Sequence, residues 1–453
     1  MSNSHWPQLL THQRLGDNTA PNNSALRTGF QRDFDRIIFC SAFRRMQDKT
    51  QVFPLSKVDY VRTRLTHSLE TSCIGRSLGS LVGQAVIERH QLTNINAADI
   101  GNICAAACLA HDIGNPPFGH SGEEAIRHWA KTAPYGKDYV AQLTEAQRND
   151  FLAFEGNAQG FRIVSQLQNP DNEGGLQLTC AMLAAFSKYP RTSNPVGPPL
   201  SGISSKKHGI NAADQAAFQQ VADTVGLIPH AGHATAWHRH PLAYLVEAAD
   251  DIAYRVIDIE DGYRLARISY DQAISALLAL LPNANAHTDR LNSICEPKDH
   301  IEYLRAKVIN AMTQHILDCF MDNEAAILAG HFEAPLLDQL HCRAELDALL
   351  TLAREYIYCA PEVISIQAAG YQVIGDLLER FLQVIDDVAR KGDQACHHSR
   401  MLIQLIPQQF IGPVGQPSED PYIRLLRLTD FVSGMTDSYA VALYKQVTGI
   451  SLP

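Results

Sequence analysis

Apolar residues recur along most of this chain with the spacing of α-helices and seldom with the alternation of β-strands. The segment AADIGNICAAACLAHD (97–112) shows the pattern most clearly. Its apolar positions at i, i+3, i+4, i+7 and i+8 predict one buried helical face, made of Ile100, Ile103, Cys104, Ala107 and Cys108. Asn96 is placed to cap this helix, Asp99 suits its first turn, and Gly114 with the prolines that follow ends it.

Further helices are predicted over 241–259, 301–329, 362–389 and 421–447 by the same periodicity. Ser121-x-x-Glu124 matches a capping box and predicts that another helix runs through 125–130. The segment 190–209 is rich in Pro, Gly and Ser, which indicates a loop or a partly ordered insertion. The fold class expected from these patterns is all-α and multi-helical.

Composition indicates the general class of protein but says little about the reaction it catalyses or the ligand it binds. The 453 residues are 45% hydrophobic and 19% charged, a balance typical of globular proteins. No apolar run approaches the roughly 20 residues that span a membrane, and the N-terminus lacks the pattern of a signal peptide. A cytoplasmic protein without a membrane partner is therefore expected. The net charge of −10 argues against broad nucleic-acid binding but allows a local basic pocket for a small anion.

Metal-competent side chains stand at three places in the predicted helices. His67 lies in RTRLTHSLE, His111 and Asp112 end the helix over 97–112, and Asp250 or Asp251 lies on the helix over 241–259. Mixed nitrogen and oxygen donors suit Mn²⁺, Fe²⁺, Mg²⁺ or Zn²⁺. Four such ligands on an octahedral ion leave two positions for water and substrate. Each residue alone has a plain structural explanation, so the hypothesis depends on the set.

His120 and Glu123 are three residues apart at the start of the next predicted helix. Glu123 can hold one ring nitrogen of His120 and leave the other for a substrate, as acid–base catalysis requires. The N-terminus of a helix also attracts phosphate. The alternative is that Glu123 only adds negative charge to the first helical turn.

Asp250, Tyr254 and Asp258 are spaced i, i+4, i+8 and form one stripe on their helix. Such a stripe can line a pocket with a metal at one end and a sugar hydroxyl at the other. The alternative is a half-buried polar seam between helices.

Several cations are candidates for contact with phosphate, namely Arg62, Arg64, Lys188, Arg191, Lys206 and Lys207. Most basic residues in any chain are simply solvated. Arg64 and Lys188 carry more weight because they adjoin the other motifs.

Six segments resemble the bacterial dGTP triphosphohydrolases of the HD-domain superfamily of metal-dependent phosphohydrolases. They are RTRLTHSLE, CLAHDIGNPPFGHSGEEA, FEGNAQGFR, SKYPR, HRHPLAYLVEAADDIAYRVIDIEDG and DFVSGMTDSYA. They occur in the family's order between about residue 28 and residue 440. The resemblance implies an HD-domain fold with a helical C-terminal extension, and hydrolysis of a dNTP to deoxynucleoside and inorganic triphosphate.

The resemblance also implies roles for particular residues. One divalent ion, Mn²⁺ or Mg²⁺ first and Fe²⁺, Ni²⁺ or Zn²⁺ as alternatives, would be bound by His67, His111, Asp112 and Asp250. His120 resembles the catalytic histidine and Glu123 its partner. The residues that resemble the family's substrate contacts are Gln51, Arg64, Asn157, Lys188, Tyr189, Lys207, Tyr254 and Asp258. Gln51 and Asp258 would read the sugar 3′-hydroxyl, and Tyr254 would help to reject a 2′-hydroxyl.

The chain departs from the family pattern at Ser121, at Ile210-Asn211 and at Asp437-Ser438-Tyr439. These departures bear on base selectivity and regulation, so several dNTPs remain candidate substrates beside dGTP. Two other functions are alternatives: another HD-domain nucleotidase or phosphodiesterase, and a nucleotide- or single-stranded-DNA-sensing regulator with weak catalysis.

The expected organisation has three parts. Residues 1–60 form an N-terminal helical segment that contributes to the active site, and 61–275 form the HD catalytic core with a flexible insertion at about 190–210. Residues 276–453 form a C-terminal helical region for packing and oligomerisation. The resemblance further implies a homo-oligomer, with a hexamer favoured, and a nucleotide or single-stranded DNA as effector.

Overall fold

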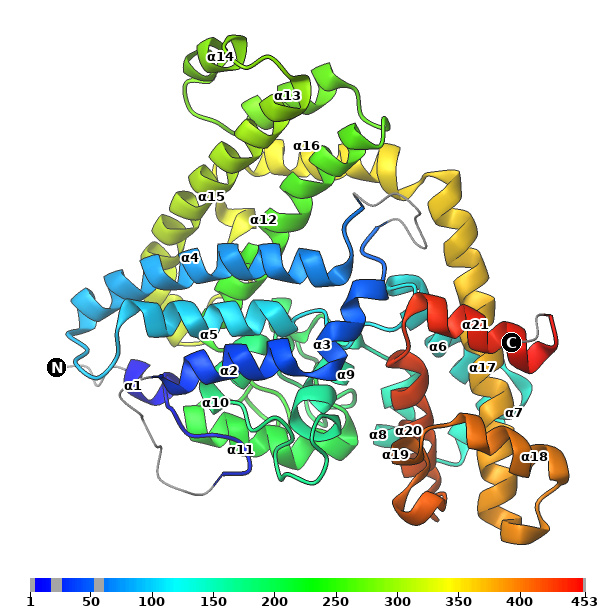
Figure 1. Ribbon diagram of the computed structural model, residues 1–453. Helices are drawn as coiled ribbons and strands as arrows, with labels where there is room; N and C mark the ends of the chain where they lie inside the picture. Colours follow the sequence, from blue (N-terminus) through cyan, green and yellow to red (C-terminus); the bar gives the residue numbers. More distant parts are fainter. Residues whose placement is uncertain (1–4, 18–26, 53–60, 451–453) are drawn as a thin grey trace.

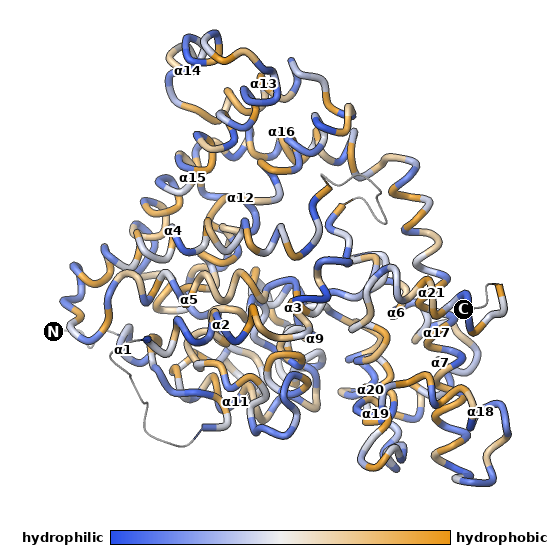
Figure 2. Tube along the Cα trace, in the orientation of Figure 1, coloured by the Kyte–Doolittle hydropathy of each residue, from blue (hydrophilic) through white to orange (hydrophobic). Residues whose placement is uncertain are grey.

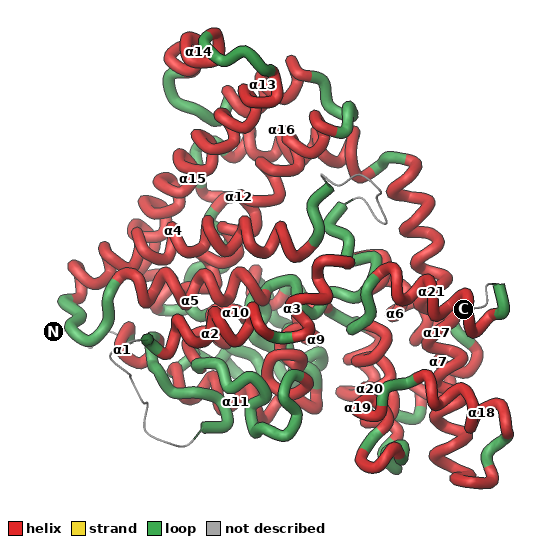
Figure 3. Tube along the Cα trace, in the orientation of Figure 1, coloured by secondary structure: helices red, strands yellow, loops and turns green. Residues whose placement is uncertain are grey.

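The fold is built from helices joined by loops. The computed structural model describes residues 5–17, 27–52 and 61–450. Within these residues the β-structure is limited to isolated bridges and no strand forms (Figure 3). The prediction of an all-α protein is therefore confirmed. None of the described helices is long and apolar enough to cross a membrane.

The helices follow one another along the whole described chain. Those of the first half are α1 (Trp6–Leu9), α2 (Gly29–Phe39), α3 (Ser41–Arg45), α4 (Arg64–His90), α5 (Ala97–Ala110), α6 (His120–Thr132), α7 (Pro134–Ala141), α8 (Glu145–Leu152), α9 (Gly156–Arg162), α10 (Cys180–Phe186), α11 (Gln215–Val225) and α12 (Pro241–Arg264). Those of the second half are α13 (Tyr270–Leu278), α14 (Ala284–Asn292), α15 (Pro297–Leu328), α16 (Arg343–Ala353), α17 (Pro361–Lys391), α18 (His397–Leu402), α19 (Gln408–Ile411), α20 (Pro421–Ser433) and α21 (Asp437–Thr448). Short 3₁₀ and π segments connect several of them, including η3 (Ile203–Ser205) and η6 (Arg354–Tyr358).

Helix α5 lies in the larger of two hydrophobic clusters. Most of its fourteen residues are buried, as expected of a helix that is apolar on every side. It packs against α4, α2, α10 and α12, and Figure 1 shows α4, α5 and α2 lying side by side. Asn96 caps its start as predicted, because the Asn96 side chain accepts from the backbone N–H of Asp99.

Glycines on α4 allow it to approach α5 closely. A Cβ atom at Gly75 would lie 2.4 Å from Sγ of Cys108, and one at Gly79 would lie 2.8 Å from Sγ of Cys104. The two glycines are one helical turn apart and therefore share a face. Because α4 and α5 run in opposite directions, this contact brings the start of α4, with His67, to the end of α5, where His111 lies.

The second hydrophobic cluster joins α6 to the C-terminal helices α17, α20 and α21. Apolar and polar colours alternate along α17 in Figure 2, and its apolar positions are the buried ones. Helix α17 descends one side of the molecule and packs against α6 (Figure 1). The C-terminal region thus supports the helix that begins at His120.

Two predicted elements differ in the structure. The helix expected over 421–447 is divided into α20 and α21, because the chain breaks at Gly434 and Thr436 caps the second helix. Helix α6 begins at His120 with Gly119 as its N-cap, and no side chain caps it. Ser121 therefore lies inside the first turn, and the predicted capping box is wrong.

The segment 190–209 is a loop, as predicted, and contains the short helix η3.

Candidate active site

His67, His111 and Asp250 come together from three helical segments. Their ligand atoms all lie within 4.8 Å of one another. Nε2 of His67 is 3.0 Å from Oδ1 of Asp250, and Nε2 of His111 is 3.4 Å from the same oxygen. Nδ1 of His111 lies 2.7 Å from the carbonyl oxygen of Cys108. When Nδ1–H donates to that carbonyl, the lone pair of Nε2 points toward the other two residues, as a metal ligand requires.

Asp112 completes the group of four predicted ligands. Its Oδ1 lies 3.6 Å from Nε2 of His111. Because α5 ends at Ala110, the adjacent side chains of His111 and Asp112 lie in a turn and can face the same point. Burial alone would raise the pKa of Asp112, but the charges of Arg64 and the histidines lower it to about 2. The four residues therefore offer two imidazole nitrogens and two carboxylates to a divalent ion, a donor set that fits Mn²⁺ or Mg²⁺ as well as Fe²⁺ or Zn²⁺.

His120 stands at the start of α6 and is held by Glu123. Nδ1 of His120 lies 2.8 Å from Oε2 of Glu123, while 85% of the His120 side chain is exposed. The other oxygen of Glu123 accepts from the backbone N–H of Gly156 at 2.7 Å. Burial would raise the pKa of Glu123, but the hydrogen bond and charge of His120 lower it. Glu123 is thus a buried carboxylate that orients His120 and leaves its Nε2 facing the solvent-filled cavity.

One cavity of about 800 Å³ joins these groups. Thirteen of the fourteen predicted site residues line it, and His67 lies behind them. The lining members of the prediction are Gln51, Arg64, His111, Asp112, His120, Glu123, Asn157, Lys188, Tyr189, Lys207, Asp250, Tyr254 and Asp258. The cavity is large enough to enclose a small-molecule ligand such as a nucleotide.

Three of the predicted phosphate cations, Arg64, Lys188 and Lys207, line the cavity, each beside a carboxylate. Nη1 of Arg64 is 2.5 Å from Oδ2 of Asp112. Nζ of Lys188 is 3.1 Å from Oε1 of Glu247, and Nζ of Lys207 is 2.9 Å from Oε2 of Glu155. Tyr189 is buried beside Lys188 and stacks under the guanidinium of Arg239. Asn157 lies at the start of α9 and lines the same cavity.

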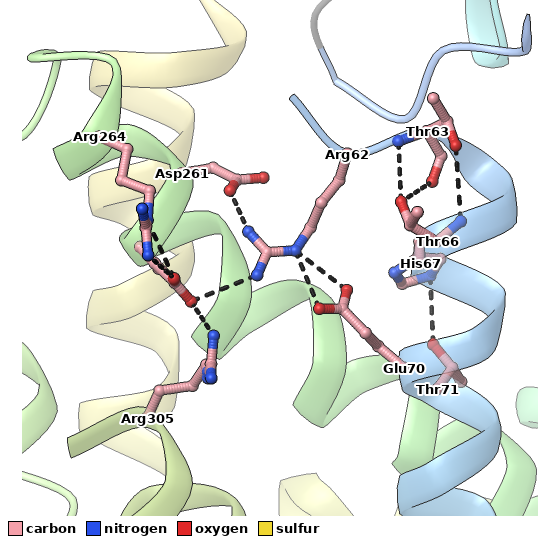
Figure 4. A network of polar contacts seen from close by, with 10 residues as sticks. Arg62, Thr63, Thr66, His67, Glu70, Thr71, Asp261, Arg264 and Arg305 are labelled. Carbon is pink, nitrogen blue, oxygen red and sulfur yellow. Dashed lines mark hydrogen bonds and ion pairs between the residues drawn. The ribbon is translucent and has the colours of Figure 1, made fainter. Parts of the chain in front are cut away.

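Arg62 does not belong to this set. Its guanidinium is bonded to Glu70, Glu260 and Asp261, and Arg264 and Arg305 also contact Glu260 (Figure 4). Arg62 is therefore committed to a buried network that fixes the start of α4 to α12.

Arg191 also lies outside the lining, where its Nε donates to the carbonyl of Lys207. Lys206 lines the cavity with Lys207. Of the six cations considered from the sequence, four thus reach the cavity.

The stripe on α12 lies along the cavity wall from Asp250 to Asp258. Tyr358 donates a hydrogen bond to Asp258, and burial raises the pKa of Asp258 to about 6. On the opposite segment, the buried Oε1 of Gln51 has no hydrogen-bond partner in the part of the chain that the structure describes. A polar oxygen buried without a partner marks a place where a ligand's donor group fits.

Two features of the site come from the C-terminal region and were not predicted. Arg354, Tyr358, Val363 and Gln367 line the cavity from η6 and α17. Asp437, at the start of α21, accepts hydrogen bonds from the backbone N–H groups of Phe118 and Thr50, each at 3.0 Å. The motif DFVSGMTDSYA contributed to the family resemblance and contains Asp437. The role of Asp437 could not be predicted from it, because its hydrogen-bond partners lie more than 300 residues away.

Comparison with known proteins supports one family. The HD domain model matches residues 64–185, and the phosphohydrolase-associated domain model matches residues 339–446. The chain is 43% identical to a deoxyguanosinetriphosphate triphosphohydrolase-like protein of Synechocystis sp., over 99% of this chain and 100% of that protein. It is 38% identical to a protein of the same name from Pseudomonas aeruginosa, over 99% of each chain. A third such protein, from Listeria monocytogenes, is 36% identical over 98% of this chain and 100% of the relative.

Proposed function

This chain belongs to the deoxyguanosinetriphosphate triphosphohydrolase-like family of HD-domain phosphohydrolases, and we propose that it is a metal-dependent dNTP triphosphohydrolase. It would hydrolyse dGTP or several dNTPs to a deoxynucleoside and inorganic triphosphate. The observation that carries the proposal is the arrangement of the cavity. Its lining combines two members of the metal-competent group, His111 and Asp250, with Asp258 and with the cavity cations Arg64, Lys188 and Lys207.

We propose His67, His111, Asp112 and Asp250 as the ligands of one divalent ion. When bound, such an ion supplies Lewis-acid polarisation of the phosphate and lowers the pKa of a water molecule. Arg64 also supports this set, because its ion pair with Asp112 orients the carboxylate. Mn²⁺ or Mg²⁺ is the expected ion, because two of the four proposed ligands are carboxylates and such ions prefer oxygen ligands.

Arg64, Lys188 and Lys207 would hold the triphosphate. Each cation already lies in the cavity beside a carboxylate, so its charge is positioned before the substrate arrives. Charge that develops on the phosphate oxygens in the transition state is stabilised by cations placed in advance. Asn157 and Tyr189, which line the same cavity, would complete the contacts around the phosphate chain.

His120 would move a proton at its Nε2 atom to or from the reacting oxygens. The hydrogen bond from Nδ1 to Glu123 fixes the ring, and the exposed side chain can meet the α-phosphate and the leaving 5′-oxygen. A positioned histidine of this kind contributes about 10²–10⁴-fold to the rate.

The deoxyribose would lie along the α12 stripe. Tyr254 would pack on the sugar where a 2′-hydroxyl would stand. Asp258 would accept from the 3′-hydroxyl, and the side-chain amide of Gln51, whose Oε1 has no partner in the described part of the chain, would donate to the oxygen of the same hydroxyl. The base would then extend toward the wall formed by Arg354, Tyr358 and Gln367. These residues come from the C-terminal region, so base preference would be decided there.

The decisive experiment is product identification. The purified protein is incubated with each of the four dNTPs and Mn²⁺, and the products are resolved by ion-exchange chromatography. Deoxynucleoside plus triphosphate is expected. Mono- or diphosphate products would instead indicate another HD-domain phosphohydrolase, and no turnover without an added dNTP or single-stranded DNA would favour the sensing regulator. The variant His111→Ala, assayed in parallel, excludes a contaminating phosphatase if its activity is lost.

We also propose a homo-oligomer, a hexamer first, with a nucleotide or single-stranded DNA as effector. The proposal is carried by family membership alone. Mass photometry with and without dNTP measures the subunit number, and a monomer under both conditions would contradict it.

A further inference from the structure

A second group of metal-competent side chains lies outside the lining of the cavity. His230 follows α11, His238 precedes α12, and Glu333 follows α15. Their ligand atoms all lie within 4.8 Å of one another. Nδ1 of His238 is 3.0 Å from Oε1 of Glu333, and the two imidazole rings have centroids 3.8 Å apart. Three loops thus place two imidazoles and one carboxylate at one point.

These donors have the chemistry and spacing of a four-coordinate zinc site. Two histidine nitrogens and one glutamate oxygen are a common Zn²⁺ ligand set, with water in the fourth position. The donor atoms of a tetrahedral zinc ion lie roughly 3.3 Å apart when its bonds are about 2.0–2.1 Å. The observed separations therefore need only small side-chain rotations. We propose that His230, His238 and Glu333 bind one divalent transition-metal ion, with Zn²⁺ as the best match, at a site separate from the active-site cavity.

The surroundings of the three residues suit a metal ion. The side chains of His238 and Glu333 are 21% and 26% exposed, so an ion can enter from solvent. His230 is also only partly buried, so all three side chains lie within reach of solvent.

The site would secure the loop that carries the cavity lysines. The hydroxyl of Ser204, in η3, lies 2.9 Å from Oε2 of Glu333 and 3.3 Å from Nε2 of His230. At Gly202, with φ of 90°, a Cβ atom would lie 2.3 Å from the same Glu333 oxygen, so the backbone rests directly on the carboxylate. Lys206 and Lys207 follow immediately and line the cavity. An ion held by Glu333 would therefore limit the movement of both lysines.

The proposed metal site is also connected to the segment that carries Lys188. Arg239, next to His238, donates from Nε to the carbonyl of Lys188 at 2.7 Å and pairs with Glu247. A metal at His238 would thus limit the movement of the segment that leads to α12 as well as of the loop after η3. The alternative is that no metal binds here and that Ser204 and His238 only donate hydrogen bonds to Glu333. The experiment must distinguish a bound metal from this hydrogen-bond network.

The test is zinc stoichiometry in the full-length protein. The protein is treated with a chelator, reloaded with Zn²⁺, dialysed, and analysed by mass spectrometry of the metal. His238→Gln should hold one zinc ion fewer per chain than wild type. His341→Gln, which alters the His315, His341 and Cys342 group elsewhere, should hold as many as wild type. Ser204→Ala, which removes only the hydroxyl hydrogen bonds, should also keep its zinc. Equal zinc in His238→Gln and wild type, with both folded by circular dichroism, would overturn the proposal.

A second measurement decides the case if His238→Gln does not fold. The His111→Ala protein, whose catalytic metal group is broken, is titrated with Co²⁺. Intense visible absorption typical of four-coordinate cobalt is expected, and its absence would overturn the proposal.

The effect on the loop is read by limited proteolysis. Lys206 is exposed and offers trypsin a cleavage site. Zn²⁺ should slow cleavage after Lys206 and Lys207 about tenfold in wild type, because it must be released before the loop opens. It should have no such effect in His238→Gln. Equal protection of both proteins by Zn²⁺ would show that the ion acts elsewhere.

Discussion

Asp437 should control both the stability and the catalytic geometry of this protein, although it lies far from the HD motifs in sequence. Its side chain is 1% exposed. One oxygen accepts from the backbone N–H of Phe118, two residues before His120, and the other accepts from Thr50, one residue before Gln51. Asp437 is therefore a positioning residue that ties two walls of the cavity to α21.

The magnitude follows from the donors that Asp437→Ala would leave unpaired. A buried N–H without a partner costs about 1–3 kcal/mol. The N–H of Phe118 lies in a buried residue, whereas Thr50 is half-buried and water can reach it. We expect a loss of about 2–4 kcal/mol in the free energy of unfolding. A displacement of about 1 Å in the His120 loop should lower kcat on the order of 10²-fold. Asp437→Asn keeps one acceptor oxygen and should lie between Ala and wild type in both quantities.

The assay pairs urea denaturation with steady-state kinetics at a temperature where every variant is folded. Asp420→Ala is the matched control, because Asp420 caps the neighbouring α20 and is exposed. It should lose about 1 kcal/mol, as a helix cap does, with kcat unchanged. If Asp437→Ala keeps the kcat of wild type, or is no less stable than Asp420→Ala, the reasoning about Asp437 is refuted.

Three further predictions concern other parts of the structure. His120→Gln should keep bound metal but lower kcat about 10²–10⁴-fold, and a normal rate in the kinetic assay would remove His120 from the mechanism. Gly75→Val should push α4 from α5 at Cys108, separate His67 from His111, and so weaken metal binding in a Mn²⁺ titration; unchanged affinity would show that the helices can adjust. Burial raises the pKa of Asp150 to about 6, so the folded state binds more protons than the unfolded state between about pH 4 and pH 6. Wild type should therefore gain about 2 kcal/mol relative to Asp150→Asn between pH 7 and pH 4, measured by urea denaturation, and a constant difference would contradict the shift.

Local patterns were sufficient for most of the secondary structure. The helix at α5 was predicted from its apolar period and from the Asn96 cap, both of which act within a few residues. The errors arose where a local signal was ambiguous. Ser121 had the spacing of a capping box, but the helix already begins at His120 with Gly119 as its N-cap. The break before α21 depends on Gly434 and Thr436, which interrupt an otherwise continuous apolar period.

The sequence by itself determined that this protein is helical, and it supplied the residue types of a divalent-metal group, because helical periods, caps and ligand chemistry are properties of short segments. The tertiary structure decided which of these residues meet. Arg62 and Arg64 are two residues apart, yet Arg62 faces a buried acidic network and Arg64 faces the cavity. Tyr358 and Asp437 reach the site from the C-terminal region. Contacts between residues so distant in the chain depend on how whole helices pack, and the periodicity within one segment cannot predict them.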